Sequence, residues 1–197
     1  MTKKVLSATV MILAFSLGVA LSQDKGGKGG GGKGPAGPGL TLTSPDFQDG
    51  GVIPDKFSQK GGQMGPSPKL EWTNVPMGTQ SFVLLFHDPD VALQKKLDDV
   101  THWMAFNIPG TARELPGGVS ADAKLPDGTI QIKNTRNAVG YMGPGAGAAG
   151  PYHHYTFELF ALDTKLDLTD AASRAEVMKA IDGHIIGKAV LEGRFHQ

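Results

Sequence analysis

The chain contains no cysteine among its 197 residues. Disulfide bonds, catalytic thiolates and zinc sites built from thiolates are therefore excluded, and the stability of the fold must come from packing. The chain also has no surplus of charge, because 19 Lys and Arg residues balance 19 Asp and Glu residues. A neutral chain lacks the basic surface typical of proteins that bind nucleic acid or anionic membranes, so neither partner is expected.

Long apolar runs are scarce too, and the one present lies at the start of the chain. Two lysines precede a mostly apolar stretch, residues 5–21, and the small residues Ala20 and Ser22 fit a cleavage site. We predict that residues 1–22 are a signal peptide and that the protein is periplasmic or secreted, with no membrane span after cleavage. The run approaches the length of a short membrane span, so an uncleaved N-terminal anchor is the alternative. Without the two lysines, 17 basic residues stand against 19 acidic ones, a net charge of −2.

The next segment has no residue that can build a core. Residues 26–39 contain nine glycines, two lysines and two prolines. This composition is typical of a flexible linker, which we place at residues 23–39, with one folded domain over residues 40–197. A glycine-rich phosphate-binding loop is the alternative, but no strand precedes the segment and no Gly-Lys-Ser/Thr ending follows it.

Short segments with the alternating pattern of β-strands occupy most of the predicted domain. Asp-Gly and Pro-Gly turn sequences separate them. The pattern predicts a mainly β fold. The strongest strand candidates are residues 81–88, 102–109 and 155–162, and the weaker ones are residues 40–44, 128–134 and 188–195.

One α-helix is predicted over residues 169–181. Thr169 or Asp170 is the expected N-cap, and Gly183 follows the expected end. The apolar residues at helical spacing within the segment indicate a core-facing stripe. At residues 93–99 the sequence predicts a short surface helix or a turn.

Each of the three strongest strands carries an ionisable residue at one end of an apolar face: Asp88, His102 and His153. In a regular strand every second side chain points to the same face. Along residues 102–108 this alternation places His102 on one face with Met104 and Ile108. If the first strand is antiparallel to the other two, the three ionisable side chains lie at the same end of the sheet. An apolar floor with a few convergent polar groups is typical of a small-ligand site.

The residues around these strand ends favour an anion. The glycine-rich loop 141–151 allows backbone N–H groups to approach a ligand closely. His153 shares a strand face with Tyr155, whereas His154 points to the opposite face. Asp88 would repel an anion, so we expect it to fix the tautomer of a histidine or to bind an ammonium or a protonated phosphate.

Five segments in order carry a family resemblance: residues 44–58, 67–90, 102–109, 140–163 and 183–195. Together they make the chain similar to the phosphatidylethanolamine-binding protein family, in particular its bacterial Raf-kinase-inhibitor-like branch. The resemblance implies a β-sandwich, in which a large mixed sheet packs on a smaller one, with a C-terminal helix. It also implies a small pocket for phosphate-like or carboxylate groups and no established catalytic residues.

The resemblance assigns ligand-binding roles to residues of this chain. It matches the first aspartate of a D-P-D turn, two pocket histidines with an adjacent tyrosine, and two glycines of a pocket loop. The matching residues are Asp88, His102, His153, Tyr155, Gly143 and Gly145. The chain departs from the family pattern at Ala92, where a proline is common, and at His154, where a G-x-H-R segment has arginine. The segment GPGAGAAG also lacks the usual proline-rich rim.

These observations predict an exported, non-enzymatic binding protein whose partner is a small anion, phosphate or a phospholipid head group. No cofactor and no metal are expected. One alternative is a phosphoesterase or ester hydrolase in which Asp88 and His102 or His153 act as the base. A second is a metal site formed by the same three residues with Asp90. A third is an extracellular protease inhibitor or interaction module.

Overall fold

The computed structural model describes residues 38–62, 64–93, 95 and 98–197. The predicted signal peptide and residues 23–37 of the predicted linker lie outside this part. So do residues 94, 96 and 97, which belong to the segment predicted as a short helix or turn.

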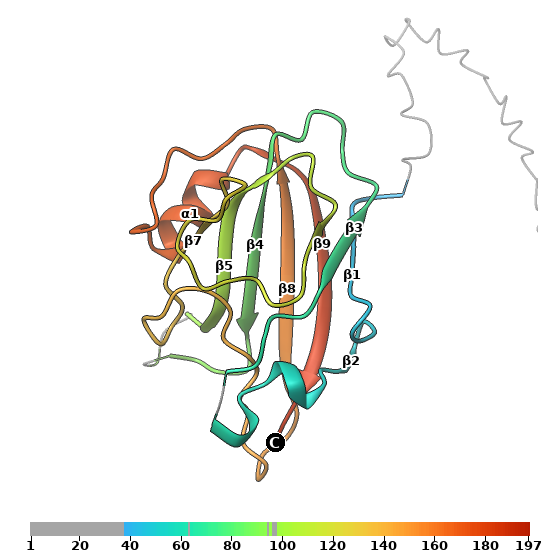
Figure 1. Cartoon of the computed structure of the whole chain (residues 1–197), viewed down its shortest axis with the longest axis vertical. Helices are drawn as coiled ribbons and strands as arrows, with labels where there is room; N and C mark the ends of the chain where they lie inside the picture. Colours follow the sequence, from blue (N-terminus) through green and yellow to red (C-terminus); the bar gives the residue numbers. More distant parts are fainter. Residues whose placement is uncertain (1–37, 63, 94, 96–97) are drawn as a thin grey trace, which may run out of the picture. The chain divides into compact units, whose positions relative to one another are not determined.

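The larger of two sheets has six strands in the order β2-β9-β8-β4-β5-β7 (Figure 1). Only β2 and β9 pair in parallel, and the other neighbours are antiparallel, so the sheet is mixed as predicted. The strands are β2 (Gly51–Val52), β4 (Ser81–Asp88), β5 (Val100–Pro109), β7 (Ile130–Gln131), β8 (His153–Leu162) and β9 (Ile185–Phe195).

The smaller sheet has three antiparallel strands in the order β1-β3-β6. They are β1 (Thr41–Thr43), β3 (Leu70–Thr73) and β6 (Glu114–Leu115). Two 3₁₀ turns, η1 (Asp55–Phe57) and η2 (Lys60–Gly62), lie between β2 and β3. The predicted mainly β fold with a large mixed sheet and a smaller sheet is therefore confirmed, as are the three strongest strand predictions.

The larger sheet buries apolar side chains on both faces. Leu84 and Phe86 of β4 belong to a core that includes Trp72 of the smaller sheet. Val83 and Leu85, which alternate with them, belong to a second core that includes Val177 of α1. Because β4 is covered on both sides, it reads as a continuous apolar run in the sequence.

A β-bulge changes the direction of His102. Between Phe86 and His87 the pairing advances one residue along β4 but two residues along β5, so His102 is the extra residue. Its ring lies 5.3 Å from that of Phe86 and 5.2 Å from that of Tyr155, on the sandwich side. Met104 packs on the opposite side. Strict alternation was therefore wrong for His102, because a bulge re-aims a side chain without any change in local composition.

A second irregularity near the end of β5 moves Ile108. Asn107 has a positive φ of 55°, and the pairing with β4 shifts beside it. Ile108 consequently packs in the sandwich core, whereas Met104 and Phe106 pack on the helix side. The alternation prediction for Ile108 was wrong for the same reason as for His102.

The helix α1 (Arg174–Ile181) begins later than predicted. Its N-cap is Ser173, not Thr169 or Asp170, and Ser173 and Glu176 form a reciprocal capping box. This Ser-x-x-Glu pair satisfies two backbone N–H groups of the first turn, which explains where the helix starts. Gly183 has a φ of 80° just beyond the end, as expected. In the described part of the chain, no helix is long and apolar enough to cross a membrane.

Candidate functional site

A cavity of about 240 Å³ lies where β4 ends and β5 and β8 begin. Both β5 and β8 run antiparallel to β4, which is the condition under which the sequence placed the three strand ends together. Asp88, His102 and His153 line this cavity together with Gly145 and Tyr155. Five of the six predicted ligand-binding residues are thus brought together.

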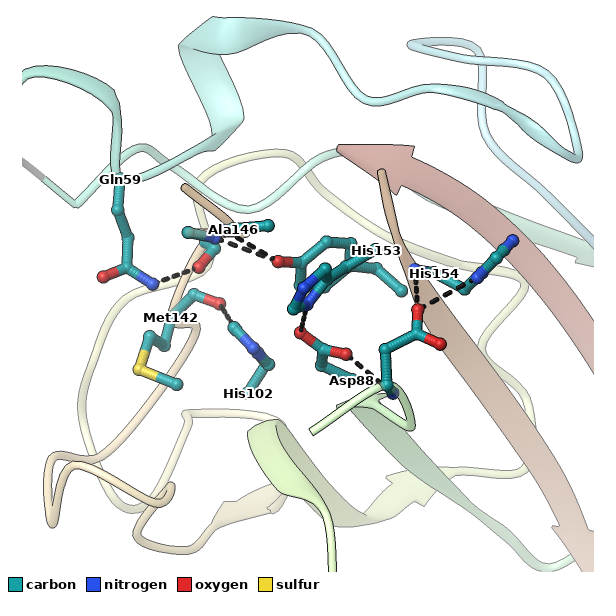
Figure 2. Close-up of polar contacts among 11 residues, drawn as sticks. Gln59, Asp88, His102, Met142, Ala146, His153 and His154 are labelled. Carbon is teal, nitrogen blue, oxygen red and sulfur yellow. Dashed lines mark hydrogen bonds and ion pairs between the residues drawn. The ribbon is translucent and has the colours of Figure 1, made fainter. Parts of the chain in front are cut away.

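Asp88 and His153 form the polar centre of the cavity. The Asp88 side chain is almost fully buried, and its Oδ2 lies 2.8 Å from Nδ1 of His153 (Figure 2). Its Oδ1 accepts a hydrogen bond of 3.0 Å from the backbone N–H of Asp90. Because a carboxylate only accepts, the proton resides on Nδ1 of His153, and Nε2 is the ring nitrogen left for a ligand.

His102 is held in a defined tautomer. Its Nδ1 lies 2.8 Å from the carbonyl oxygen of Met142, which can only accept, so Nδ1 carries a proton. Burial lowers the pKa of His102 below the ordinary histidine value, and the opposing effects of the Met142 carbonyl and of Asp88 are smaller. At neutral pH His102 is therefore uncharged, and its Nε2 is a hydrogen-bond acceptor.

Tyr155 organises the glycine-rich loop. Its hydroxyl oxygen accepts hydrogen bonds from the backbone N–H groups of Gly145, at 3.2 Å, and Ala146, at 3.0 Å. Burial raises the pKa of Tyr155 to about 12, so the phenol stays protonated. The sequence led us to expect such N–H groups at a ligand, but these two bind Tyr155 instead.

Gly143 has a different role from Gly145. It is not among the described residues that line the cavity. A Cβ atom at Gly143 would lie 2.3 Å from the carbonyl oxygen of Phe57, and the Gly143 carbonyl accepts a hydrogen bond of 2.6 Å from the Gln59 amide. Glycine at position 143 therefore allows the loop to pack closely against the segment that follows β2.

The two adjacent histidines separate as predicted. His153 faces the cavity, whereas His154 lies on the other strand face with its Nδ1 2.9 Å from Oδ2 of Asp90. The backbone N–H of His154 donates to the same oxygen at 2.6 Å (Figure 2). His154 thus contacts the turn that follows β4 and does not line the cavity.

Three polar residues that line the cavity were not predicted from the sequence: Gln59, Thr135 and Arg136. Arg136 is exposed and follows Asn134, whose side-chain oxygen accepts from the Arg136 backbone N–H at 3.0 Å. The Asn-Thr-Arg-Asn sequence signals only a local turn. Gln59 lies in the 3₁₀ region, far from the strand ends in sequence, and no local pattern places it there.

Three side chains have the spacing of a metal site. Asp88, Asp90 and His153 offer ligand atoms that all lie within 4.8 Å of one another, but His102 is not part of this group. Both oxygens of Asp88, Nδ1 of His153 and Oδ2 of Asp90 already make hydrogen bonds. We therefore interpret the group as a hydrogen-bonded network.

Comparison with known proteins identifies the family. A sequence model described as phosphatidylethanolamine-binding protein matches residues 43–196. The chain belongs to this family. A UPF0098 protein of Methanothermobacter thermautotrophicus is 37% identical over 158 residues, which cover 80% of this chain and 99% of that protein.

Further family members agree in sequence and in structure. The crystal structure of Escherichia coli YbcL, described as a member of the mammalian PEBP family, superposes with a TM-score of 0.71 at 28% identity. The match covers 81% of this chain and 99% of YbcL. A Mycobacterium tuberculosis protein named as a candidate lipoprotein, LppC, is 35% identical over 82% of this chain and 74% of its own length.

Proposed function

We propose that this protein is an exported binding protein without enzymatic activity, whose cavity takes a small anionic group. Phosphate and the phosphate-bearing head group of a phospholipid share the required chemistry. One observation carries the proposal: Arg136 and His153 both line the same cavity, next to buried aromatic side chains of the core. Guanidinium groups are always charged and match the geometry of phosphate oxygens.

The size of the cavity supports a small ligand. Its volume of about 240 Å³ lies below the range of roughly 300–1,000 Å³ that is usual for drug-sized ligands. A head group fits this volume better than a whole lipid with its acyl chains.

The negative charge of Asp88 restricts which anion fits. Asp88 is bonded to His153, and neutral His102 offers only an acceptor at Nε2. A ligand that combines an anionic oxygen with a protonated oxygen or an ammonium group satisfies both kinds of partner. Monohydrogen phosphate and phosphoethanolamine meet this requirement.

Two observations support export. The N-terminal sequence has the charge and apolar pattern of a signal peptide. The related M. tuberculosis protein bears a lipoprotein name, which belongs to exported proteins.

Thermal unfolding in the presence of phosphate or phosphoethanolamine tests the proposal. A ligand that binds only the native state at 100 times its dissociation constant adds about 2.7 kcal/mol of stability. In a domain of this size the midpoint Tm then rises by roughly 5–10 °C. The rise should shrink in His153→Ala and Arg136→Gln.

Arg113→Gln is the matched control, because Arg113 is exposed but does not line the cavity. It should keep the full shift. Absence of any shift up to millimolar ligand, or an equal shift in all variants, would contradict the anion pocket.

A hydrolase is the second candidate, since the Asp88–His153 pair has the arrangement of an oriented general base. The described residues that line the cavity include no serine, and the chain has no cysteine. Turnover of p-nitrophenyl phosphate that disappears in His153→Ala would favour this candidate over a binding protein.

A further inference from the structure

We propose that a second cavity extends the binding site, and that the ligand is a phosphate ester whose hydroxylated substituent, such as a glycerol or sugar moiety, lies in it. The inference rests on the proposed function, because the first cavity holds the phosphate. It adds the chemical class of the group that is attached to this phosphate.

The second cavity adjoins the first. It has a volume of about 380 Å³, and three of its described lining residues also line the first cavity: Gln59, Arg136 and Gly145. Its other described lining residues are Gly62, Met64 and Gln197. The shared residues mark the boundary at which the two cavities meet, so one ligand that extends past them occupies both.

Gln59 places a fixed hydrogen-bond acceptor at this boundary. It is only 9% exposed, its backbone N–H donates to the carbonyl of Pro144 at 2.8 Å, and its Nε2 donates to the carbonyl of Gly143 at 2.6 Å (Figure 2). Because a carbonyl oxygen only accepts, the Gly143 contact fixes which end of the amide is nitrogen. Oε1 accepts no hydrogen bond from the described residues and is left for a ligand. An amide oxygen repels an anionic oxygen but accepts from a hydroxyl, so it suits the substituent rather than the phosphate.

Arg136 supplies hydrogen-bond donors to both cavities. No described residue accepts a hydrogen bond from its guanidinium, and its backbone N–H donates to Oδ1 of Asn134 at 3.0 Å. A guanidinium has five N–H donors in a planar fork. Arg136 can therefore donate to a phosphate oxygen in the first cavity and to a hydroxyl oxygen in the second.

The lining of the second cavity disfavours an acyl chain. Met64 is the one apolar side chain among its described lining residues, and the others are glutamine, arginine or glycine. Apolar chains gain from contact with apolar surface, whereas hydroxyl groups need polar partners. A short polyol therefore suits this cavity better than a lipid tail.

Gly145 leaves space at the boundary between the cavities. A Cβ atom at this position would lie 2.7 Å from Nε2 of Gln59, which is too close for an ordinary contact. The φ of Gly145 is not positive, so the backbone tolerates alanine and only the flexible end of Gln59 has to move. Gly145→Ala should therefore fold and narrow the boundary. Gly147→Ala is the matched control in the same loop, because its Cβ would meet no atom within 4 Å and Gly147 lines neither cavity.

The test is the dissociation constant, measured by calorimetry, of methyl phosphate, propyl phosphate and glycerol 3-phosphate. All three are phosphate monoesters and differ only in the substituent. We expect glycerol 3-phosphate to bind about three- to tenfold more tightly than either alkyl ester, as suits one added hydrogen bond. Glycerophosphoethanolamine distinguishes the sources of the ligand: it should bind more tightly than glycerol 3-phosphate if the ligand is a phospholipid head group, and less tightly if the ligand is a free polyol phosphate.

The variants locate the substituent. Gly145→Ala and Gln59→Leu should each bring the affinities for glycerol 3-phosphate and methyl phosphate close to each other, whereas Gly147→Ala should keep the difference. The affinity for methyl phosphate reports any change in the first cavity, so the ratio of the two affinities isolates the second. A thermal unfolding curve shows whether each variant is folded.

Equal affinities of the wild type for methyl phosphate and glycerol 3-phosphate, or a gain that propyl phosphate shares, would overturn the inference and leave the anion pocket intact. A preference for glycerol 3-phosphate that survives in both Gly145→Ala and Gln59→Leu would overturn it too. Absence of binding by all four compounds would overturn the proposed function and this inference with it.

Discussion

A single phenol decides the conformation of the loop beside the cavity. Tyr155 is 1% exposed, and its oxygen accepts two backbone hydrogen bonds from Gly145 and Ala146. Its ring also packs against those of Phe86 and His102. The tyrosine therefore supports the cavity from beneath and is one of its lining residues at the same time.

Tyr155→Phe should lower the free energy of unfolding by about 1–3 kcal/mol, because the buried N–H of Ala146 and the partly buried N–H of Gly145 lose their acceptor. Urea denaturation measures the effect. Tyr152→Phe is the matched control, since Tyr152 is 41% exposed. A Tyr155→Phe protein as stable as the control would show that water or another group replaces the hydroxyl at no cost.

Among the elements, α1 is fastened to the larger sheet by an ionic contact as well as by its apolar stripe. Asp99, just before β5, bonds Arg174 at the start of α1, and its Oδ2 lies 2.7 Å from Nδ1 of His87 on β4. Burial acts to raise the pKa of Asp99, but the hydrogen bonds that its carboxylate accepts from Arg174 and His87 outweigh burial and hold the pKa below its ordinary value. One carboxylate thus connects two strands and the helix.

Because the folded-state pKa of Asp99 is depressed, its contribution to stability is complete above the unfolded value of about 3.9 and is lost as pH falls through the folded value. Asp99→Asn should lower the free energy of unfolding at pH 7 by about 1–3 kcal/mol. Below about pH 4, the free energy of unfolding of this variant should also fall less steeply with decreasing pH than that of the wild type.

Urea denaturation between pH 7 and pH 3 measures both effects of this substitution. Asp163→Asn removes a carboxylate from an exposed pair and serves as the control. If Asp99→Asn lost stability in acid as steeply as the wild type, the ionic contact would not be the cause.

At the scale of the whole molecule, both faces of the larger sheet are covered within residues 40–197. Leu40 and Leu42 already belong to the sandwich core, and Phe195 near the end of the chain does too. Within the described residues, the sandwich core therefore extends from Leu40 to Phe195.

Limited trypsin digestion of the full chain should cut first at Lys25, Lys28 or Lys33, because the glycine-rich composition predicts accessible backbone there. The remaining fragment should keep the Tm of the undigested protein, as measured by calorimetry. A lower Tm after cleavage would show that the N-terminal residues contribute to the stability of the domain.

The sequence alone determined the mainly β class, the three long strands and the separation of His153 from His154. These features depend on the two-residue period of a strand, which is a local property of the chain. The meeting of Asp88, His102 and His153 at one end of the sheet was predicted only on the condition that the first strand is antiparallel to the other two, and the structure supplied that direction. The family resemblance fixed the two-sheet arrangement.

Only the tertiary structure decided which way His102 points, that Arg136 and Gln59 join the cavity, and that Tyr155 rather than a ligand takes the loop N–H groups. A bulge is defined by the partner strand, and the position of a loop by residues distant in sequence, so neither leaves a local pattern. Gly143 and Gly145 look alike in sequence, yet one packs against Phe57 and the other lines the cavity. The difference arises because the loop is packed against the segment after β2, a contact between residues more than eighty positions apart.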